Sequence, residues 1–257
     1  MMKAGVINEH VFEEPEATDP VLVCGLPGSG YVGKLAADHL VSSFKLRKVA
    51  EYTSSAFPPQ VSVKEDGTVD PPRGELFFSQ TKEGRSLFVF TADAQPTTSE
   101  GEYELSDAVI RFAGKCGVKE VYTLAAYITG SFSNSPKVYG AGTSMNITKS
   151  LAEKGVTMMR DGGISGMNGL LIGVAALRGL EGACLLGETS GYVVDAGASK
   201  AVLEMLSKVV GMPIDTSMLR EKAEETQKVI SQLQAMAEQS RETTPQPGRE
   251  QRPGYIG

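Results

Sequence analysis

Apolar and polar positions alternate in blocks along the first 210 residues of the chain. Short, nearly continuous apolar runs are typical of strands covered on both faces, whereas apolar positions three or four residues apart indicate helices. Strands are predicted at residues 21–24, 47–52, 74–80, 86–91, 120–127 and 183–187. Helices are predicted at residues 32–44, 102–116, 142–154, 166–178 and 199–210. This alternation predicts an α/β fold with a mixed, largely parallel sheet flanked by helices.

Two further segments depart from this alternation. Residues 56–72 contain prolines and the turn-forming sequence Lys64-Glu65-Asp66-Gly67, which together predict a hairpin or an irregular excursion. Between residues 219 and 237, apolar or small side chains recur in steps of four and three, which predicts a C-terminal helix. That helix either lies on the domain or pairs with a neighbouring subunit. The predicted organisation is an α/β core domain at 1–215, a helix at 216–239 and a flexible tail at 240–257.

The tail is polar and contains prolines, so it cannot bury enough apolar surface to order itself. It ends, however, in Gly254-Tyr255-Ile256-Gly257, which places two large apolar side chains at the tip of a tether. One interpretation is a frayed terminus without a role. The other is a partner-binding anchor formed by Tyr255, Ile256 and Gly257, whose carboxylate and side chains dock into a pocket of another protein.

Composition narrows the range of partners and locations. The 257 residues carry a net charge of −6 and a pI near 5.2, which argues against nucleic acid or an anionic membrane as partner. No apolar run approaches the roughly 20 residues that cross a bilayer, and the N-terminus does not resemble a signal peptide. The three cysteines, Cys24, Cys116 and Cys184, are interpreted as buried free thiols. A soluble, cytoplasmic protein is expected.

A glycine-rich loop follows the first predicted strand and nearly matches two phosphate-binding motifs. Gly28, Gly30 and Gly33 satisfy the dinucleotide pattern G-x-G-x-x-G, and Glu51 stands where an acidic residue would bind a ribose. Pro27, however, has no N–H to donate to a pyrophosphate.

The same loop also satisfies most of the P-loop pattern, from Gly28 to Lys34. Leu35 stands where Ser or Thr would bind Mg²⁺, so the metal half of that site is missing. The third interpretation, which we favour, is a tight turn that lets a strand pass into a closely packed helix. Gly28, Ser29, Gly30 and Gly33 remain the candidate ligand loop.

Candidates for catalysis are scarce. The two histidines, His10 and His39, have no metal-binding spacing, and neither a metal nor a cofactor is predicted. Asp93, Glu188 and Asp195 stand at predicted strand ends and could line a cleft, and Asp93 and Glu188 could act as acid and base if they converged. Acidic residues at such positions often only cap helices or loops. No catalytic residue is assigned.

Several sequence blocks, taken together, are more specific than the glycine loop alone. The first blocks are Gly25-Leu26-Pro27-Gly28-Ser29-Gly30-Tyr31-Val32-Gly33 and Leu124-Ala125-Ala126-Tyr127-Ile128-Thr129-Gly130. The strongest blocks are Ile164-Ser165-Gly166-Met167-Asn168-Gly169-Leu170-Leu171, Ala175-Ala176-Leu177-Arg178-Gly179 and Cys184-Leu185-Leu186-Gly187-Glu188-Thr189-Ser190-Gly191-Tyr192. These blocks, in this order over about residues 20 to 210, resemble the proteasome assembly chaperone family of archaea and some bacteria.

The resemblance implies a fold like that of nucleoside phosphorylases, no established catalytic site, and homo-oligomers that help to assemble the proteasome core particle. It also implies a C-terminal hydrophobic-Tyr-any tail that inserts between proteasome α subunits. This chain departs from that tail pattern, because Tyr255 is third from the end and Gly254 precedes it.

The leading hypothesis is therefore a non-enzymatic assembly chaperone or scaffold. It would form a homo-oligomer and bind proteasome subunits or a second assembly factor through its tail. The alternative is a nucleoside- or phosphate-binding enzyme, or a ligand sensor, that uses the loop at residues 25–33.

Overall fold

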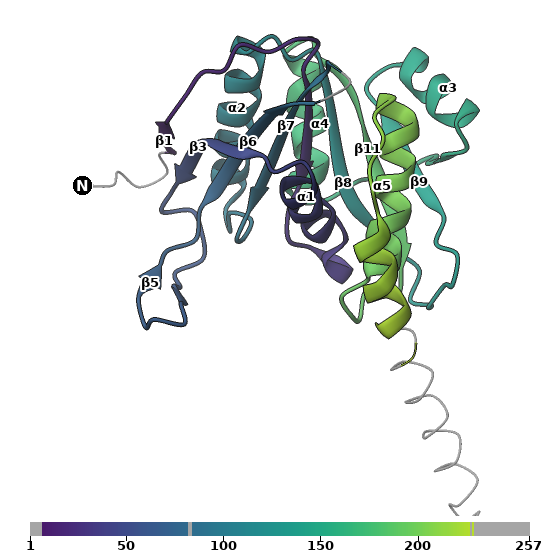
Figure 1. Cartoon of the computed structure of the whole chain (residues 1–257). Coiled ribbons are helices and arrows are strands. Elements are labelled where there is room, and N and C mark those ends of the chain that lie inside the picture. The colour runs from purple at the N-terminus through teal and green to yellow at the C-terminus, as the bar shows by residue number, and fades with distance from the viewer. Residues whose placement is uncertain (1–6, 82–83, 227, 229–257) are drawn as a thin grey trace, which may run out of the picture.

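The computed structural model describes residues 7–81, 84–226 and 228, which form one large sheet with helices on both faces (Figure 1). The strands of this nine-stranded sheet follow the order β1-β3-β6-β7-β2-β8-β11-β9-β10. Their bounds are β1 (Asn8–Val11), β2 (Val21–Gly25), β3 (Arg47–Thr53), β6 (Gly74–Gln80), β7 (Ser86–Ala92), β8 (Glu120–Ile128), β9 (Val138–Gly142), β10 (Thr157–Met158) and β11 (Glu181–Thr189). A separate hairpin joins β4 (Ser62–Val63) to β5 (Val69–Asp70).

Pairing is parallel at the centre of the sheet and mostly antiparallel toward its edges. β7, β2, β8 and β11 run parallel to one another. On one side, β1, β3 and β6 continue the sheet by antiparallel pairing, and on the other side β9 pairs antiparallel with β11. Every residue of β2 and β7 is buried, as expected for strands covered on both faces. The predicted mixed α/β sheet flanked by helices is confirmed, and so is the predicted hairpin within residues 56–72.

Five regular helices and a 3₁₀ turn connect these strands in the described part of the chain. Their bounds are η1 (Ser29–Tyr31), α1 (Val32–Ser43), α2 (Ser99–Lys115), α3 (Met145–Glu153), α4 (Met167–Leu177) and α5 (Ala196–Val210). A further helical stretch covers residues 217–226. None of the described helices has the length and apolar character that crossing a membrane would require.

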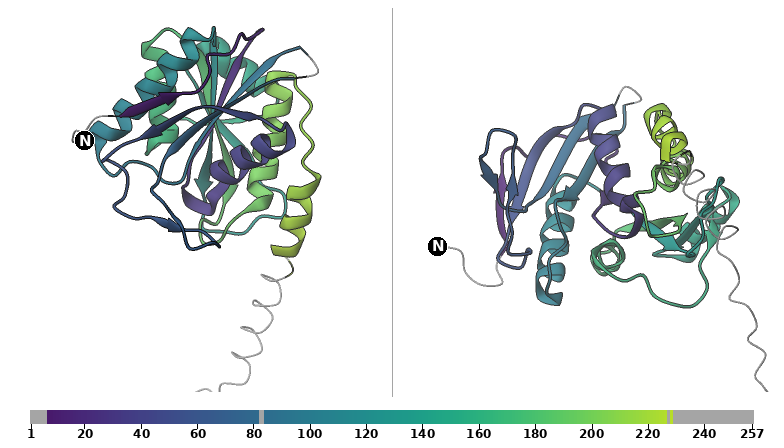
Figure 2. Two further views of the ribbon diagram at one scale, coloured as in Figure 1. Left: turned by 60° about the vertical axis from the view of Figure 1, so that its left-hand side comes forward. Right: turned by 90° about the horizontal axis from the view of Figure 1, so that it is seen from below.

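The two faces of the sheet carry separate cores. Along β2, Leu22 and Cys24 pack into the core beneath α2 and α4, whereas Val21 and Val23 pack into the core beneath α1 and α5. The right-hand view of Figure 2 shows the helices lying on opposite sides of the sheet. This alternation is the period-two pattern of a strand buried on both sides.

Sequence patterning did not predict β1, β9 and β10, and it placed the start of one helix too early. The predicted helix at 142–154 begins at Met145, because Gly142 still belongs to β9. Gly140 and Gly142 weaken the strand signal of β9, since glycine has a low preference for strands. Both are nevertheless required there, because an added Cβ would press on Val156 or Ile147 of the covering segment.

The predicted C-terminal helix is described only in its first turns. Residues 217–226 are helical, and Leu219 is 1% exposed within the core beneath α5. These turns therefore lie on the domain. The remainder of the predicted helix, apart from residue 228, and the predicted tail at 240–257 lie outside the described residues.

Candidate functional site

The glycine-rich loop forms a close turn between β2 and α1. A Cβ at Gly33 would overlap the Leu124 carbonyl oxygen of β8, and one at Gly25 would overlap the Gly33 carbonyl oxygen. These glycines therefore allow α1 to pack directly on β2 and β8. Gly30 has φ = 61° and the following Tyr31 has φ = 56°, both left-handed, and the chain reverses there before α1. The prediction of a tight strand-to-helix turn is confirmed.

The structure does not complete either phosphate-binding motif. Glu51 lies on β3, which is separated from β2 by β6 and β7, so Glu51 is too far from the loop to bind a ribose there. Its carboxylate instead pairs with Lys48 and Arg73, both at 3.4 Å. Lys34 pairs with Asp38 along α1, with 2.7 Å between Nζ and Oδ1.

Of the three acidic residues predicted to line a cleft, Asp195 does line a groove, beside α5, whereas Asp93 and Glu188 bond to backbone N–H groups. The Asp93 carboxylate accepts a hydrogen bond from the backbone N–H of Arg73, and that of Glu188 accepts one from the backbone N–H of Lys137, both at 3.0 Å. Asp93 follows β7 and Glu188 lies in β11, three strand spacings apart, or about 14 Å. The hypothesis that they converge as acid and base is therefore wrong.

Asp195 joins the glycine loop to α5. Its carboxylate caps α5 by accepting a hydrogen bond from the Ala198 N–H at 2.8 Å, and it accepts another from the Thr189 hydroxyl at 2.7 Å. Its own N–H donates to the Gly30 carbonyl at 2.8 Å. One aspartate thus fixes the end of β11, the start of α5 and the glycine loop relative to one another.

The histidines and cysteines occupy structural positions. His39 Nε2 lies 2.6 Å from the Asp215 carbonyl oxygen and holds the segment after α5 against α1, whereas His10 is exposed beside Phe12. Burial raises the pKa of Cys24 and raises that of Cys184 to about 12. All three cysteines are free thiols, but the prediction that all are buried is wrong for Cys116, which is only partly buried. Among the described residues, no cluster of three His, Cys, Asp or Glu side chains could hold a metal ion.

A cavity of about 380 Å³ opens beside the glycine loop, outside the carboxyl ends of β2 and β8. Gln95 ties two of its walls together, because its amide donates to the Pro27 carbonyl at 2.6 Å and accepts from the Met167 N–H at the start of α4 at 2.8 Å. The lining residues are Leu26, Gly28, Ser29, Gly33, Gln95, Ala125, Ala126, Tyr127, Ile128, Met159, Gly163, Ile164, Ser165, Gly166, Asn168 and Leu186.

Of the predicted ligand loop, Gly28, Ser29 and Gly33 line this cavity, whereas Gly30 does not. Sequence reasoning missed Gln95 and Asn168 as parts of the site. Asn168 carried one usable signal, a carboxamide within an otherwise apolar helix. Gln95 carried none, because the sequence does not reveal that it bridges residues 27 and 167.

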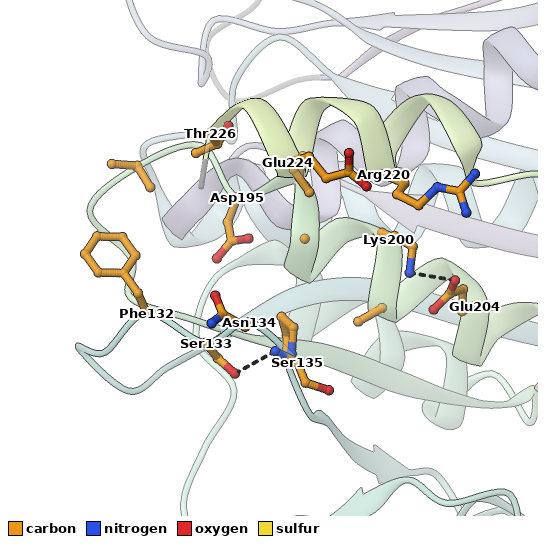
Figure 3. A pocket seen from close by; sticks show the side chains of 16 residues that line it. Phe132, Ser133, Asn134, Ser135, Asp195, Lys200, Glu204, Arg220, Glu224 and Thr226 are labelled. Atoms are coloured by element: carbon orange, nitrogen blue, oxygen red, sulfur yellow. Dashed lines mark hydrogen bonds and ion pairs between the residues drawn. The ribbon is translucent and has the colours of Figure 1, made fainter. Parts of the chain in front are cut away.

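A second groove, of about 500 Å³, lies between α5, the loop at 132–136 and the helical stretch at 217–226 (Figure 3). Its floor contains small residues, and Ala223 packs close to Gly197 of α5. Its charged side chains include the Lys200–Glu204 ion pair, at 2.8 Å, and Arg220. The last described helical turns, up to residue 226, form one wall of this groove.

Exposed apolar side chains follow the carboxyl ends of β2, β8 and β11. Among them Tyr192 is 78% exposed and Ile128 is 60% exposed, and we call this group the apolar rim. Its members are Tyr31, Ile128, Phe132, Tyr192, Val193 and Val194. Exposed apolar side chains of this kind are available to contact another molecule. The predicted partner-binding residues Tyr255, Ile256 and Gly257 lie outside the described residues.

Comparison with known proteins identifies the family. The model of the PAC2 family matches residues 22–234. The chain belongs to the PAC2 family. The prediction of a proteasome assembly chaperone homologue is confirmed, since the solved structures that this chain is similar to include PbaA of Pyrococcus furiosus, an archaeal homologue of proteasome-assembly chaperone.

Two relatives match nearly the whole chain at higher identity than PbaA. An uncharacterised protein of Methanocaldococcus jannaschii is 35% identical over 100% of both chains. PbaB of Pyrococcus furiosus, an archaeal proteasome activator, is 35% identical with a TM-score of 0.81, over 89% of this chain and 98% of PbaB. PbaA is 27% identical with a TM-score of 0.74, over 92% of this chain and 94% of PbaA.

Proposed function

We propose that this PAC2 protein is a non-enzymatic scaffold that binds the proteasome core particle, or a second assembly factor, through its C-terminal segment. The observation that carries the proposal is the 35% identity to PbaB over 98% of that activator, together with its shared fold. The chain end adds support, because Tyr255 and Ile256 provide an apolar anchor beyond a polar stretch. A homo-oligomeric body would present several such ends and strengthen a weak individual contact.

The structural roles of the acidic residues are consistent with a binding protein. Asp93, Glu188 and Asp195 are each engaged with backbone groups, and the first two lie too far apart to act on one substrate. The apolar rim provides a second surface for protein contacts.

A binding experiment separates the tail from the body. Proteasome core particles from the same organism are immobilised, and the full chain is compared with a chain that lacks residues 249–257. We expect the truncated protein to lose capture while size-exclusion chromatography with light scattering and the thermal unfolding midpoint remain unchanged.

Two tyrosine variants provide the matched control. Tyr255→Ala removes the aromatic ring near the chain end, whereas Tyr192→Ala removes an exposed ring from the apolar rim. Loss of capture with Tyr255→Ala alone supports the tail as the anchor. Undiminished capture by the truncated chain would refute it, and loss with Tyr192→Ala alone would transfer the binding role to the rim.

The likeness to PbaB favours a second candidate, activation of the mature core particle rather than its assembly. The two functions act on different states of the core particle. An activator raises peptide hydrolysis by preassembled particles, whereas an assembly chaperone raises the yield of particles formed from separated α and β subunits. Both assays with the full and truncated chains decide between them.

A further inference from the structure

α4 is apolar on every side, although one of its sides faces solvent. No charged residue occurs between residues 164 and 177, and the polar side chain within the helix, Asn168, is buried. A surface helix normally carries polar residues on its outer side, whereas a helix that is apolar all round is normally buried. Yet Gly173, Ala176 and Leu177 are exposed, Leu177 by 85%. α4 thus has the sequence of a helix covered on both sides, and the described part of the chain covers only one.

α2 packs beside α4 on the same face of the sheet and extends this exposed surface (Figure 2). Tyr103 of α2 is 56% exposed, and a shallow groove of about 580 Å³ is lined from both helices. Arg178 Nε donates a hydrogen bond to Asp107 Oδ1 at 2.7 Å, which joins the end of α4 to α2. The exposed apolar and small residues of this surface, which we call the α2–α4 face, are Tyr103, Gly173, Ala176 and Leu177.

Gly173 indicates that another surface approaches α4 closely. Glycine in the interior of a helix is less stable than alanine, so it is expected there only where a side chain would not fit. Within the described part of the chain, however, nothing lies within 4 Å of a Cβ added at Gly173. No contact inside the molecule therefore accounts for this glycine. A second helix packed against α4 would account for it, because the missing side chain lets the two backbones come close together.

The charges along α2 indicate what fits this face. Its exposed side chains are acidic toward the N-terminus, at Glu100 and Glu104, and basic toward the C-terminus, at Arg111 and Lys115. Arg111 and Lys115 form ion pairs within the described chain, whereas Glu100 and Glu104 form none there. Two antiparallel copies of α2 place the acidic end of each beside the basic end of the other. A partner of one strong charge, by contrast, would be repelled by one of the two ends.

We propose that the α2–α4 face is the contact surface between two copies of this chain related by a twofold axis. In such a contact the same patch meets itself, so Leu177 of each copy reaches the groove of the other. α5 and the helical stretch at 217–226 lie on the opposite face of the sheet, and the pair leaves them uncovered. The proposal rests on the homo-oligomeric body of the proposed function and names the surface that forms it.

Sedimentation equilibrium of the full-length protein, from about 1 to about 100 µM, tests this surface. We expect the wild type to sediment at twice the 27.3 kDa of one chain or a multiple of that mass. Leu177→Glu places a carboxylate within the apolar contact, and we expect it to raise the Kd of the pair about a hundredfold or more and to halve the mass. Met145→Glu, at a position of α3 that is 84% exposed, is the matched control and leaves the mass unchanged. A monomeric wild type, or an oligomer that Leu177→Glu leaves intact, would overturn the proposal.

Charge reversal tests the antiparallel arrangement, and it does so even if Leu177→Glu does not fold. Glu100→Lys with Glu104→Lys makes α2 basic at both ends, whereas Arg111→Glu with Lys115→Glu makes it acidic at both ends. We expect each double variant alone to associate about tenfold more weakly than the wild type, and an equimolar mixture of the two to regain the wild-type Kd. A mixture that associates no more tightly than its separate components would refute the twofold pairing.

Capture by immobilised proteasome core particles distinguishes this proposal from the proposed function. If the full chain is not captured while Leu177→Glu still halves the mass, the contact surface stands and the proposed function fails. If removal of residues 249–257 abolishes capture by a wild type that is monomeric, the proposed tail stands and the contact surface fails. A monomeric wild type that loses capture through Leu177→Glu would show that a different protein covers the α2–α4 face, which also overturns the pairing.

Discussion

At the scale of single residues, the glycines of the first loop differ in what they do. Gly33 has no room for a side chain because the Leu124 carbonyl oxygen occupies that space, whereas nothing lies within 4 Å of a Cβ added at Gly28. The motif G-x-G-x-x-G thus reflects helix packing at one end and an open loop at the other. Sequence spacing alone cannot distinguish these roles.

Replacing Gly33 by alanine therefore destabilises the protein strongly. The added methyl group pushes α1 away from β8, and we expect the free energy of unfolding to fall by about 3 kcal/mol or more in denaturant titrations. Gly28→Ala is the matched control, since Gly28 has φ = −173° and an open environment, and it changes stability by less than about 1 kcal/mol. Equal losses from both variants would contradict the packing argument.

The buried thiols predict a loss of stability at alkaline pH. Burial raises the pKa of Cys24 and Cys184, so both stay protonated in the folded protein while they ionise in the unfolded chain above about pH 8.5. Their contribution is complete below that pH and is lost as the pH rises toward the folded-state pKa.

Between pH 9 and 10, each thiol lowers the free energy of unfolding by about 1.4 kcal/mol per pH unit. Denaturant titrations over this range measure the slope. Cys24→Ala reduces the slope by about that amount, because one titrating group is gone. Cys116→Ala also reduces the slope, because partial burial raises the pKa of Cys116 to about 11, which is still above this pH range. A slope that Cys24→Ala leaves unchanged would show that other groups cause the loss.

At the scale of elements, Asp195 shows how a residue outside the glycine loop sets its position. Asp195→Ala removes the cap of α5 and the acceptor for Thr189, and we expect a loss of about 2 kcal/mol. Asp195→Asn keeps an acceptor and costs less. Thr98→Ala, which removes the side-chain cap of α2 alone, is the comparison, with a loss of about 1 kcal/mol. If both alanine variants lose the same amount, the link to Thr189 contributes nothing.

Elements could be predicted wherever local pattern and tertiary burial agree. β2 and β7 are continuous apolar runs because both of their faces are covered, and both were predicted. β9 was not predicted, because its glycines are selected by contact with Val156 and Ile147 rather than by strand preference.

The candidate cavity could be predicted only in part, because tertiary contacts rather than local sequence pattern determine most of its lining. Its loop was visible in the sequence, but the partnership of Gln95 with Pro27 and Met167 joins residues far apart in the chain. Asn168 interrupts an apolar helix in the sequence, but only the structure shows that its Oδ1 is buried without a partner.

At the scale of the whole molecule, the body follows the family more closely than the chain end does. The body matches the PAC2 family model and holds the cavity. At the chain end, Tyr255 is third from the last residue, whereas the hydrophobic-Tyr-any pattern implied by the resemblance has a penultimate tyrosine. If the proteasome pocket requires that pattern, the native end is a weak ligand. Its affinity then depends on how many ends an oligomer presents at once.

Repairing the tail tests this register directly. Gly254→Leu combined with deletion of Gly257 ends the chain in Leu-Tyr-Ile, with the tyrosine penultimate. We expect it to bind core particles about tenfold more tightly than the native chain, because the tyrosine gains its pocket and the leucine adds buried apolar surface. Gly254→Leu alone, in which Tyr255 remains third from the end, is the control for added hydrophobicity. If the repaired end binds no better than this control while removal of residues 249–257 abolishes capture, the partner reads the native Tyr255-Ile256-Gly257 end in its own register.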